Sequence, residues 1–275
     1  MKSAISILAL FAALVCAAGD KPPPPKGMST REFRRAFLEA GIIPDIMGSF
    51  NPMVSFYAGY QNGDGNKTLM MPGSKLKLKE AKSPFEFSVE NIMNAQNVTR
   101  NSRYIVYMVG PDSPTREEPT ERNMRHYLAG NFTVEQTKSE ILSSALIMRN
   151  STPAFNDYMA PDPKSGSGVH RYVYLLYVQP EKLNKMGFDA MGVDMKQRKN
   201  FSVSQFRRQA GLGRPIGGTF FTIDMAQNSD GGNGGNNGGG DHGGGNGHGG
   251  STASIATAGS VFMFITLLTT MFVWM

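Results

Sequence analysis

The stretch at residues 104–132, YIVYMVGPDSPTREEPTERNMRHYLAGNF, constrains the fold more than any other part of the chain. Its first residues combine β-branched and aromatic side chains, which favours a strand that ends at Gly110. A polar loop with two prolines follows, and a second strand-like run opens at His126. Because prolines restrict the shape of such a loop, the pattern predicts that Asp112 and His126 lie at neighbouring strand ends, where a small ligand can sit.

The rest of the chain favours strands over helices. Strands are predicted at residues 50–60, 85–89, 169–178 and 216–223. Ser29 and Glu32 form a capping box that opens a short helix. Helical periodicity is also found at residues 135–149 and 202–210. The predicted fold class is therefore mainly β, with a sheet-on-sheet core and short peripheral helices.

Residues 1–18 are typical of a secretory signal peptide. Lys2 precedes an apolar run, and small residues follow at the expected cleavage site. The run is too short for a transmembrane anchor. Cys16, the only cysteine, lies in this segment, so the cleaved chain is expected to contain no disulfide and no cysteine-ligated metal. The four prolines at 22–25 then predict a stiff spacer over residues 19–28.

The net charge of +6 over 275 residues is modest. Mixed surface charge for solubility explains it, and so does attraction to phosphate or to anionic lipid headgroups. No block of lysine and arginine with interleaved aromatic residues is present in the sequence. Nucleic acid is therefore not a predicted partner.

The C-terminal part of the sequence changes composition twice. Residues 229–253 are mostly glycine and asparagine and predict a flexible tether. Residues 254–275 are mostly apolar and have no charged residue after them. Small residues before such a tail are the layout of a glycosylphosphatidylinositol (GPI) signal. We expect attachment at Gly249, Gly250 or Ser251, which would place the secreted protein on the outer face of the plasma membrane or cell wall. A single-pass anchor over residues 255–275 is the rival prediction, but it lacks flanking basic residues.

Five sequons accompany the predicted signal peptide. Their asparagines are Asn66, Asn97, Asn131, Asn150 and Asn200. We expect glycans at these positions, with Asn131 the weakest candidate because it falls in a predicted core strand.

Three motifs in order resemble the phosphatidylethanolamine-binding protein family. The loop at residues 110–116, GPDSPTR, and the histidine strand after it resemble the family's D-P-D-x-P-S-R unit. Residues 166–174, GSGVHRYVY, resemble its G-x-G-x-H-R-Y strand, and residues 201–221 its last helix and strand. Together they are a specific signal. The resemblance implies a family-like domain over residues 29–228, with a large antiparallel sheet packed on a smaller one and a ligand cavity at one end.

The resemblance also implies a pocket. Its predicted lining residues are Asp112, Pro114, His126, His170 and Tyr172. Two imidazoles and a phenol can donate hydrogen bonds to phosphate oxygens, so the predicted partner is phosphate or a phospholipid headgroup. Gly110 stands where the family has its first loop aspartate, which reduces repulsion toward phosphate and removes a partner for a cationic headgroup.

Purely structural interpretations of the same residues remain open. His170 and Tyr172 share one face of an apolar strand and can both be core groups. Asp112 can hydrogen-bond amides of its own loop. Arg171 alternates to the opposite face of the strand, where it can pair with an acidic neighbour.

A binding protein is the predicted class, without catalytic residues, metal or cofactor. The sequence contains no G-x-S-x-G and no H-E-x-x-H motif. The alternative is a protein-interaction module, because some relatives inhibit serine proteases, including carboxypeptidase. An extracellular serine protease is then the predicted partner, and residues 135–156 are the candidate contact surface. A structural component with a vestigial pocket is a third possibility.

Overall fold

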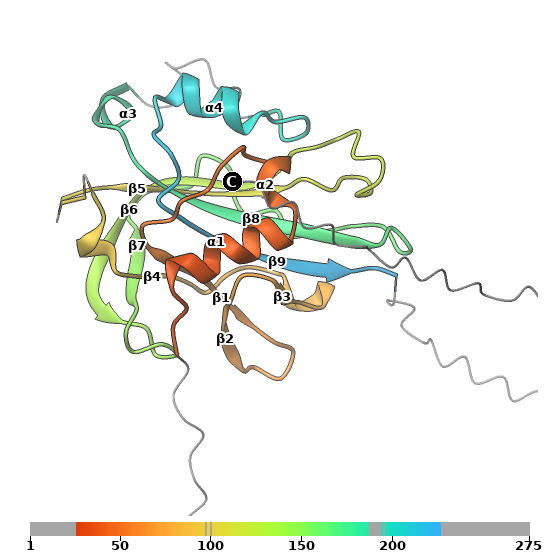
Figure 1. The fold of residues 1–275 in the computed structure, drawn as a ribbon, viewed down its shortest axis with the longest axis horizontal. Coiled ribbons are helices and arrows are strands. Elements are labelled where there is room, and N and C mark those ends of the chain that lie inside the picture. The colour runs from red at the N-terminus through yellow and green to blue at the C-terminus, as the bar shows by residue number, and fades with distance from the viewer. Residues whose placement is uncertain (1–25, 97, 100, 187–193, 195, 227–275) are drawn as a thin grey trace, which may run out of the picture. The chain divides into compact units, whose positions relative to one another are not determined.

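The computed structural model describes residues 26–226, except 97, 100, 187–193 and 195. In chain order the elements are α1 (Thr30–Glu39), α2 (Ile42–Asp45), β1 (Ser55–Gln61), β2 (Lys67–Met70), β3 (Ser74–Lys75), η1 (Leu78–Glu80), β4 (Glu86–Glu90), η2 (Ile92–Asn94), β5 (Tyr104–Gly110), β6 (Met124–Lys138), β7 (Leu146–Asn150), β8 (Val169–Val178), α3 (Glu181–Met186), α4 (Val203–Ala210) and β9 (Gly217–Asp224). Figure 1 shows the short helices lying around a strand-rich centre. The mainly β class is confirmed.

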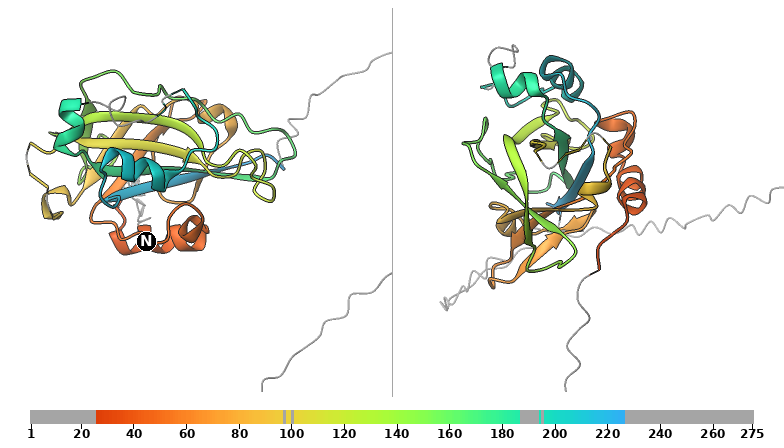
Figure 2. Two further views of the ribbon diagram at one scale, coloured as in Figure 1. Left: turned by 90° about the horizontal axis from the view of Figure 1, so that it is seen from above. Right: turned by 90° about the vertical axis from the view of Figure 1, so that its left-hand side faces the viewer.

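The strands in the described part of the chain form one sheet, in the order β2-β1-β4-β7-β6-β5-β8-β9-β3. All pairings are antiparallel except the one between β3 and β9. The amides of Met53 and Val54, just before β1, donate to the carbonyl of Ile216, just before β9. The sheet therefore curls until strands near its two ends meet, as the right-hand view of Figure 2 shows.

The predicted division into a large and a small sheet is wrong, and so is the helix at residues 135–149. In place of the helix, β6 runs on to Lys138, a turn follows, and β7 begins at Leu146. Strand β7 pairs with β4 on one side and with β6 on the other, so it joins what would otherwise be two sheets. Leu142 and Ala145, whose spacing looked helical, are buried in the turn against Phe33 and Leu69. Short apolar runs do not separate helix from strand by periodicity.

Strand β8 divides the core into two layers because its side chains alternate between the faces of the sheet. Tyr172, Tyr174 and Leu176 point into the inner layer, which the curled sheet encloses. Val173 and Leu175 point into the outer layer, which the helices cover.

Helix α1 starts where the sequence predicts, with the capping box of Ser29 and Glu32 formed. Its Phe37 stacks on Phe50, with ring centroids 4.3 Å apart, and meets Phe220 of β9 edge-on. Helix α4 packs Phe206 against Tyr107 of β5. Both helices are thus held to the sheet by aromatic contacts.

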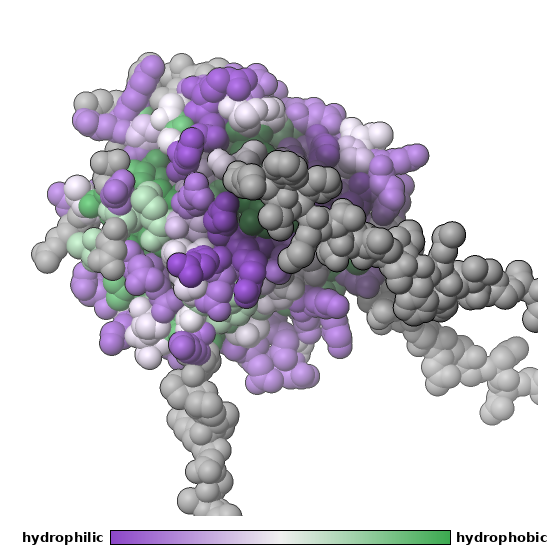
Figure 3. All heavy atoms as spheres, in the orientation of Figure 1, coloured by the Kyte–Doolittle hydropathy of each residue, from purple (hydrophilic) through white to green (hydrophobic). Residues whose placement is uncertain are grey.

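Most of the surface in Figure 3 is hydrophilic, with small scattered hydrophobic areas. Among the described residues the exposed large hydrophobic side chains are Leu38, Met53, Phe85, Met93 and Val169. No helix within the described ranges has the length and hydrophobicity needed to cross a membrane.

Candidate ligand-binding site

A cavity of about 650 Å³ opens at one end of β5, β6 and β8. Gly110 at the end of β5, His126 near the start of β6, and His170 and Tyr172 near the start of β8 line it. The antiparallel register places these strand ends side by side, since Gly110 pairs with Met124 and Val109 with Val173. All five residues predicted for the pocket line this one cavity.

An extra residue in β6 turns His126 toward the cavity. Met108 of β5 pairs with Tyr127, but the next residue, Val109, pairs with Arg125, so His126 is left over between the two pairs. Such a bulge changes the direction of a side chain. His126 and Tyr127 both contact the inner layer, whereas strict alternation would have put them on opposite faces.

The His126 ring is held by a hydrogen bond at Nδ1 and by an edge-on contact with the Tyr172 ring. Its Nδ1 lies 2.8 Å from the Met159 carbonyl oxygen, which can only accept, so Nδ1 carries the hydrogen. Its ring meets Tyr172 edge-on at 5.1 Å. Burial lowers the pKa of His126 to about 4, so the ring is neutral at physiological pH and Nε2 is an acceptor.

His170 and Tyr172 differ in whether a polar atom of the side chain is already hydrogen-bonded within the protein. His170 Nε2 lies 2.7 Å from the hydroxyl of Ser167, which in turn donates to the Lys164 carbonyl. Burial lowers the pKa of His170 and raises that of Tyr172. The Tyr172 ring stacks on Phe221, and no described residue hydrogen-bonds its hydroxyl. The phenol therefore keeps its proton and is available to a ligand.

Asp112 lines the cavity, but its carboxylate already accepts hydrogen bonds from Arg171. The Arg171 backbone N–H and Nε donate to Asp112 Oδ2 at 2.8 and 2.9 Å, and Nη2 donates to Oδ1 at 2.6 Å. Both side chains are buried. The prediction that Arg171 pairs with an acidic neighbour is confirmed. The Asp112 carboxylate is therefore already hydrogen-bonded to Arg171.

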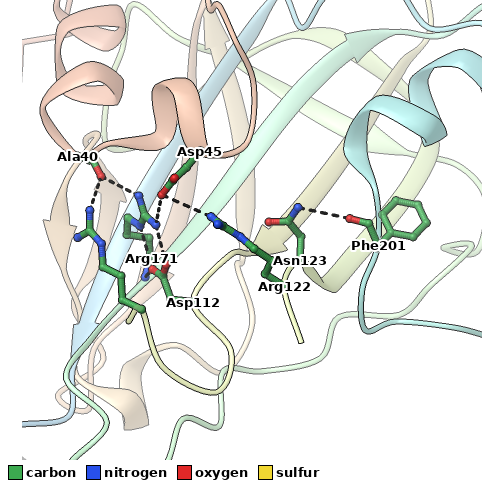
Figure 4. Close-up of polar contacts among 8 residues, drawn as sticks. Ala40, Asp45, Asp112, Arg122, Asn123, Arg171 and Phe201 are labelled. Carbon is green, nitrogen blue, oxygen red and sulfur yellow. Dashed lines mark hydrogen bonds and ion pairs between the residues drawn. The ribbon is translucent and has the colours of Figure 1, made fainter. Parts of the chain in front are cut away.

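The same arginine ties the N-terminal helices to the cavity loop, as Figure 4 shows. Arg171 Nη1 donates to the Ala40 carbonyl at the end of α1, and Nη2 also reaches Asp45 of α2 at 2.7 Å. Arg122 pairs with Asp45, and Arg116 donates to Ala40. Charged hydrogen bonds thus fix the loop between β5 and β6 against α1 and α2.

Several residues that line the cavity were not predicted from the sequence. They are Met124 and Met159 and, at the exposed mouth, Glu121, Asp162, Lys164 and Lys199. Lys199 forms an ion pair with Glu121, which also accepts a hydrogen bond from Ser113 beside Pro114. The missed residues come from loops and strand ends far apart in the sequence, and no spacing signal marked them. Within the described residues, no group of three histidine, aspartate or glutamate side chains comes together to hold a metal ion.

The predicted glycan acceptors differ in their surroundings. Asn66 and Asn200 are exposed and Asn150 is half-buried. The amide of Asn131 is engaged on both sides, because its oxygen accepts from Arg103 and Gln179 and its nitrogen donates to Thr152.

Several predicted features lie outside the described residues. They are Asn97, the signal peptide at 1–18, the tether from 229, and Gly249, Gly250 and Ser251.

Comparison with known proteins gives the family. The model described as phosphatidylethanolamine-binding protein matches residues 66–221, more than half of the chain. Putative odorant-binding protein A5 of Drosophila melanogaster is 26% identical over 218 residues, which cover 77% of this chain and 87% of that protein.

Two solved structures share the fold. One is carboxypeptidase Y inhibitor in complex with its cognate proteinase, with a TM-score of 0.56 and 20% identity over 71% of this chain and 96% of that one. The other is phosphatidylethanolamine-binding protein from Plasmodium vivax, with a TM-score of 0.51 and 19% identity over 72% and 98%. At such identities the likeness concerns the fold alone. On the strength of the family model, this chain belongs to the phosphatidylethanolamine-binding protein family.

Proposed function

We propose that this protein is a cell-surface binding protein that takes a phosphate-bearing headgroup into the cavity. The observation that carries the proposal is the convergence of His126, His170 and Tyr172 on one space of about 650 Å³. A space of this size is typical of small-molecule sites. Tyr172 offers a phenol donor inside the cavity, and Lys164 and Lys199 bring positive charge to its mouth.

The charges suit a headgroup better than a bare anion. Donors suited to phosphate are a phenol and two ammonium groups. Glu121 and Asp162 lie at the same mouth, so the site is not uniformly positive. Phosphate oxygens would therefore face the lysines and Tyr172, and the rest of the headgroup would extend along the Met124 and Met159 side of the cavity.

Titration of isotope-labelled protein with phosphate and with phosphorylethanolamine tests this function. Binding should move the ring resonances of His126 and His170, and Tyr172→Phe should weaken binding roughly tenfold to a hundredfold through loss of one hydrogen bond to a charged group. Ser204→Ala changes an exposed hydroxyl on α4, outside the cavity, and serves as the matched control. Imidazole resonances that stay unmoved at millimolar ligand would refute the proposal.

Tethering to the outer face of the membrane is part of the proposal and rests on the sequence of residues 229–275. Phosphatidylinositol-specific phospholipase C should release the protein from intact cells. Retention after treatment would refute a GPI anchor and favour a spanning segment.

Glycans are proposed at the exposed acceptors. Asn66→Gln and Asn200→Gln should each increase gel mobility, whereas Asn131→Gln should leave it unchanged because that amide is engaged within the protein. A mobility change on replacing Asn131 would contradict this assignment.

Inhibition of an extracellular serine protease is the second candidate, and the turn between β6 and β7 favours it. The Ser139 amide donates to the Ala145 carbonyl, and its hydroxyl accepts from the amides of Ile141 and Leu142. Leu142 is buried beneath the turn. A loop held this rigidly, with Glu140 exposed, is suited to contacting another protein. Replacing residues 140–144 by a glycine-serine loop should abolish any inhibition of a protease panel, and unchanged inhibition would exclude this surface.

A further inference from the structure

At its deep end, called the floor here, the cavity is lined by Gly110, His126, His170 and Tyr172, and His126 presents a hydrogen-bond acceptor rather than a donor. His126 Nδ1 donates to the Met159 carbonyl, which leaves Nε2 with a lone pair. Burial holds the ring neutral, since it lowers the pKa of His126 to about 4. No described residue donates to Nε2. Because His126 lines the cavity, this lone pair is accessible to a ligand donor.

Gly110 leaves space open beside that acceptor. A Cβ atom on Gly110 would lie 3.0 Å from His126 Nε2, 3.3 Å from His126 Cδ2 and 3.5 Å from Tyr172 Cε1. Any side chain at this position would therefore stand directly over Nε2. Since Gly110 also lines the cavity, the space it leaves is continuous with the cavity.

Other polar groups of the floor are already committed. The Asp112 carboxylate accepts three hydrogen bonds from Arg171, and His170 Nε2 is bonded to Ser167. His126 Nε2 and the Tyr172 hydroxyl are thus the floor groups left for a ligand within the described part of the site. The positive charge lies at the exposed mouth, on Lys164 and Lys199.

We propose that Gly110 is a specificity-determining residue, which admits a hydroxyl or ammonium donor of the ligand to His126 Nε2. The headgroup then enters with its donor end first and leaves its phosphate between the Tyr172 hydroxyl and the lysines at the mouth. This inference rests on the proposed binding of a phosphate-bearing headgroup. It adds the orientation of that headgroup and the residue that selects it.

Three phosphate esters of matched size test the inference by calorimetry with the full chain. They are 2-aminoethyl phosphate, 2-hydroxyethyl phosphate and n-propyl phosphate, which differ in whether their far end can donate. The two donor-tipped esters should bind about tenfold more tightly than the propyl ester, the worth of one hydrogen bond to a buried acceptor. The ratio between the amino and the hydroxyl ester shows which donor the site prefers.

Variants then locate the effect. Gly110→Ala should remove the tenfold preference by covering Nε2, while Gly213→Ala, where a Cβ would meet nothing within 4 Å, should preserve it. His126→Phe keeps an aromatic ring without the acceptor and should also remove the preference, so the test does not depend on one variant folding. Circular dichroism verifies the fold of each variant.

The possible results separate the inference from the function on which it rests. If all three esters bind equally to the unmodified protein, phosphate binding stands and the donor-first orientation is wrong. If none binds, the proposed function fails and this inference with it. A direct readout is the ¹⁵N resonance of His126 Nε2, which should shift with the donor-tipped esters and stay in place with the propyl ester. A shift common to all three would overturn the proposal.

Discussion

Replacing Arg171 by methionine should destabilise the protein more than any change to a surface ion pair. The guanidinium and backbone N–H of Arg171 make three hydrogen bonds to Asp112, and the side chain makes one each to Asp45 and Ala40. Methionine fills most of the volume but leaves the buried Asp112 carboxylate with only the backbone N–H. Removing one partner of a buried pair typically costs about 3–5 kcal/mol.

Urea unfolding of Arg171→Met at pH 7 measures this loss. Against a total stability of about 5–15 kcal/mol, a loss of about 3–5 kcal/mol should be visible as a large drop in the midpoint. Combining the change with Asp112→Asn removes the stranded charge and should recover at least about 1 kcal/mol. Arg35→Met, which breaks an exposed pair with Glu39, is the control and should leave the midpoint unchanged.

A loss below about 1 kcal/mol for Arg171→Met would refute the reasoning. So would full additivity of the Arg171 and Asp112 changes, because it would mean that the two side chains do not interact energetically.

Three further predictions concern other parts of the fold. His126 has a pKa near 6.5 in the unfolded chain and about 4 in the folded protein. Between these values the unfolded state binds more protons, so stability should fall by up to about 3 kcal/mol as the pH drops from 6.5 to 4. His126→Asn should flatten this part of the plot of urea midpoint against pH, and an equally steep plot would contradict the assignment. Gly218→Ala should lower the free energy of unfolding in urea by about 1–3 kcal/mol, because the new Cβ would lie 2.7 Å from the Tyr174 carbonyl oxygen. Gly48→Ala is the control and should be tolerated, since its Cβ would meet nothing within 4 Å. Equal effects of the two changes would argue against this packing. Ser29→Ala should lower stability by about 1 kcal/mol, whereas Ser29→Asp should retain most of the stability, because only alanine lacks a side-chain oxygen to accept from the Glu32 amide. Thermal unfolding of the two variants measures the difference. Equal losses would argue against capping by Ser29.

Local patterns predicted the elements that local chemistry controls. The capping box at Ser29 and the strands at β5, β8 and β9 lie where the sequence indicates them. Their residues carry strong signals, either side chains that cap a helix or long β-branched and aromatic runs. The pairing of Arg171 with an acid followed from alternation along β8 and the cost of an unpaired buried charge.

The segment at residues 135–149 shows where such reasoning fails. Its periodicity favours a helix, yet β7 is stabilised by pairing with β4 and β6, which are distant in the sequence or reached through a turn. Pairing of this kind overrides weak local preference. The prediction of two separate sheets was wrong for the same reason, since β7 is the strand that makes the sheet continuous.

By itself the sequence determined the family, the class of fold and five of the residues that line the cavity, because motifs and alternation are local properties of the chain. Only the tertiary structure decided how those residues are used. The bulge in β6 points His126 inward, the Met159 carbonyl fixes which nitrogen carries the hydrogen, and Arg171 takes the Asp112 carboxylate. Each of these depends on a partner at least 33 residues away or on strand register, and no pattern along the chain records such contacts.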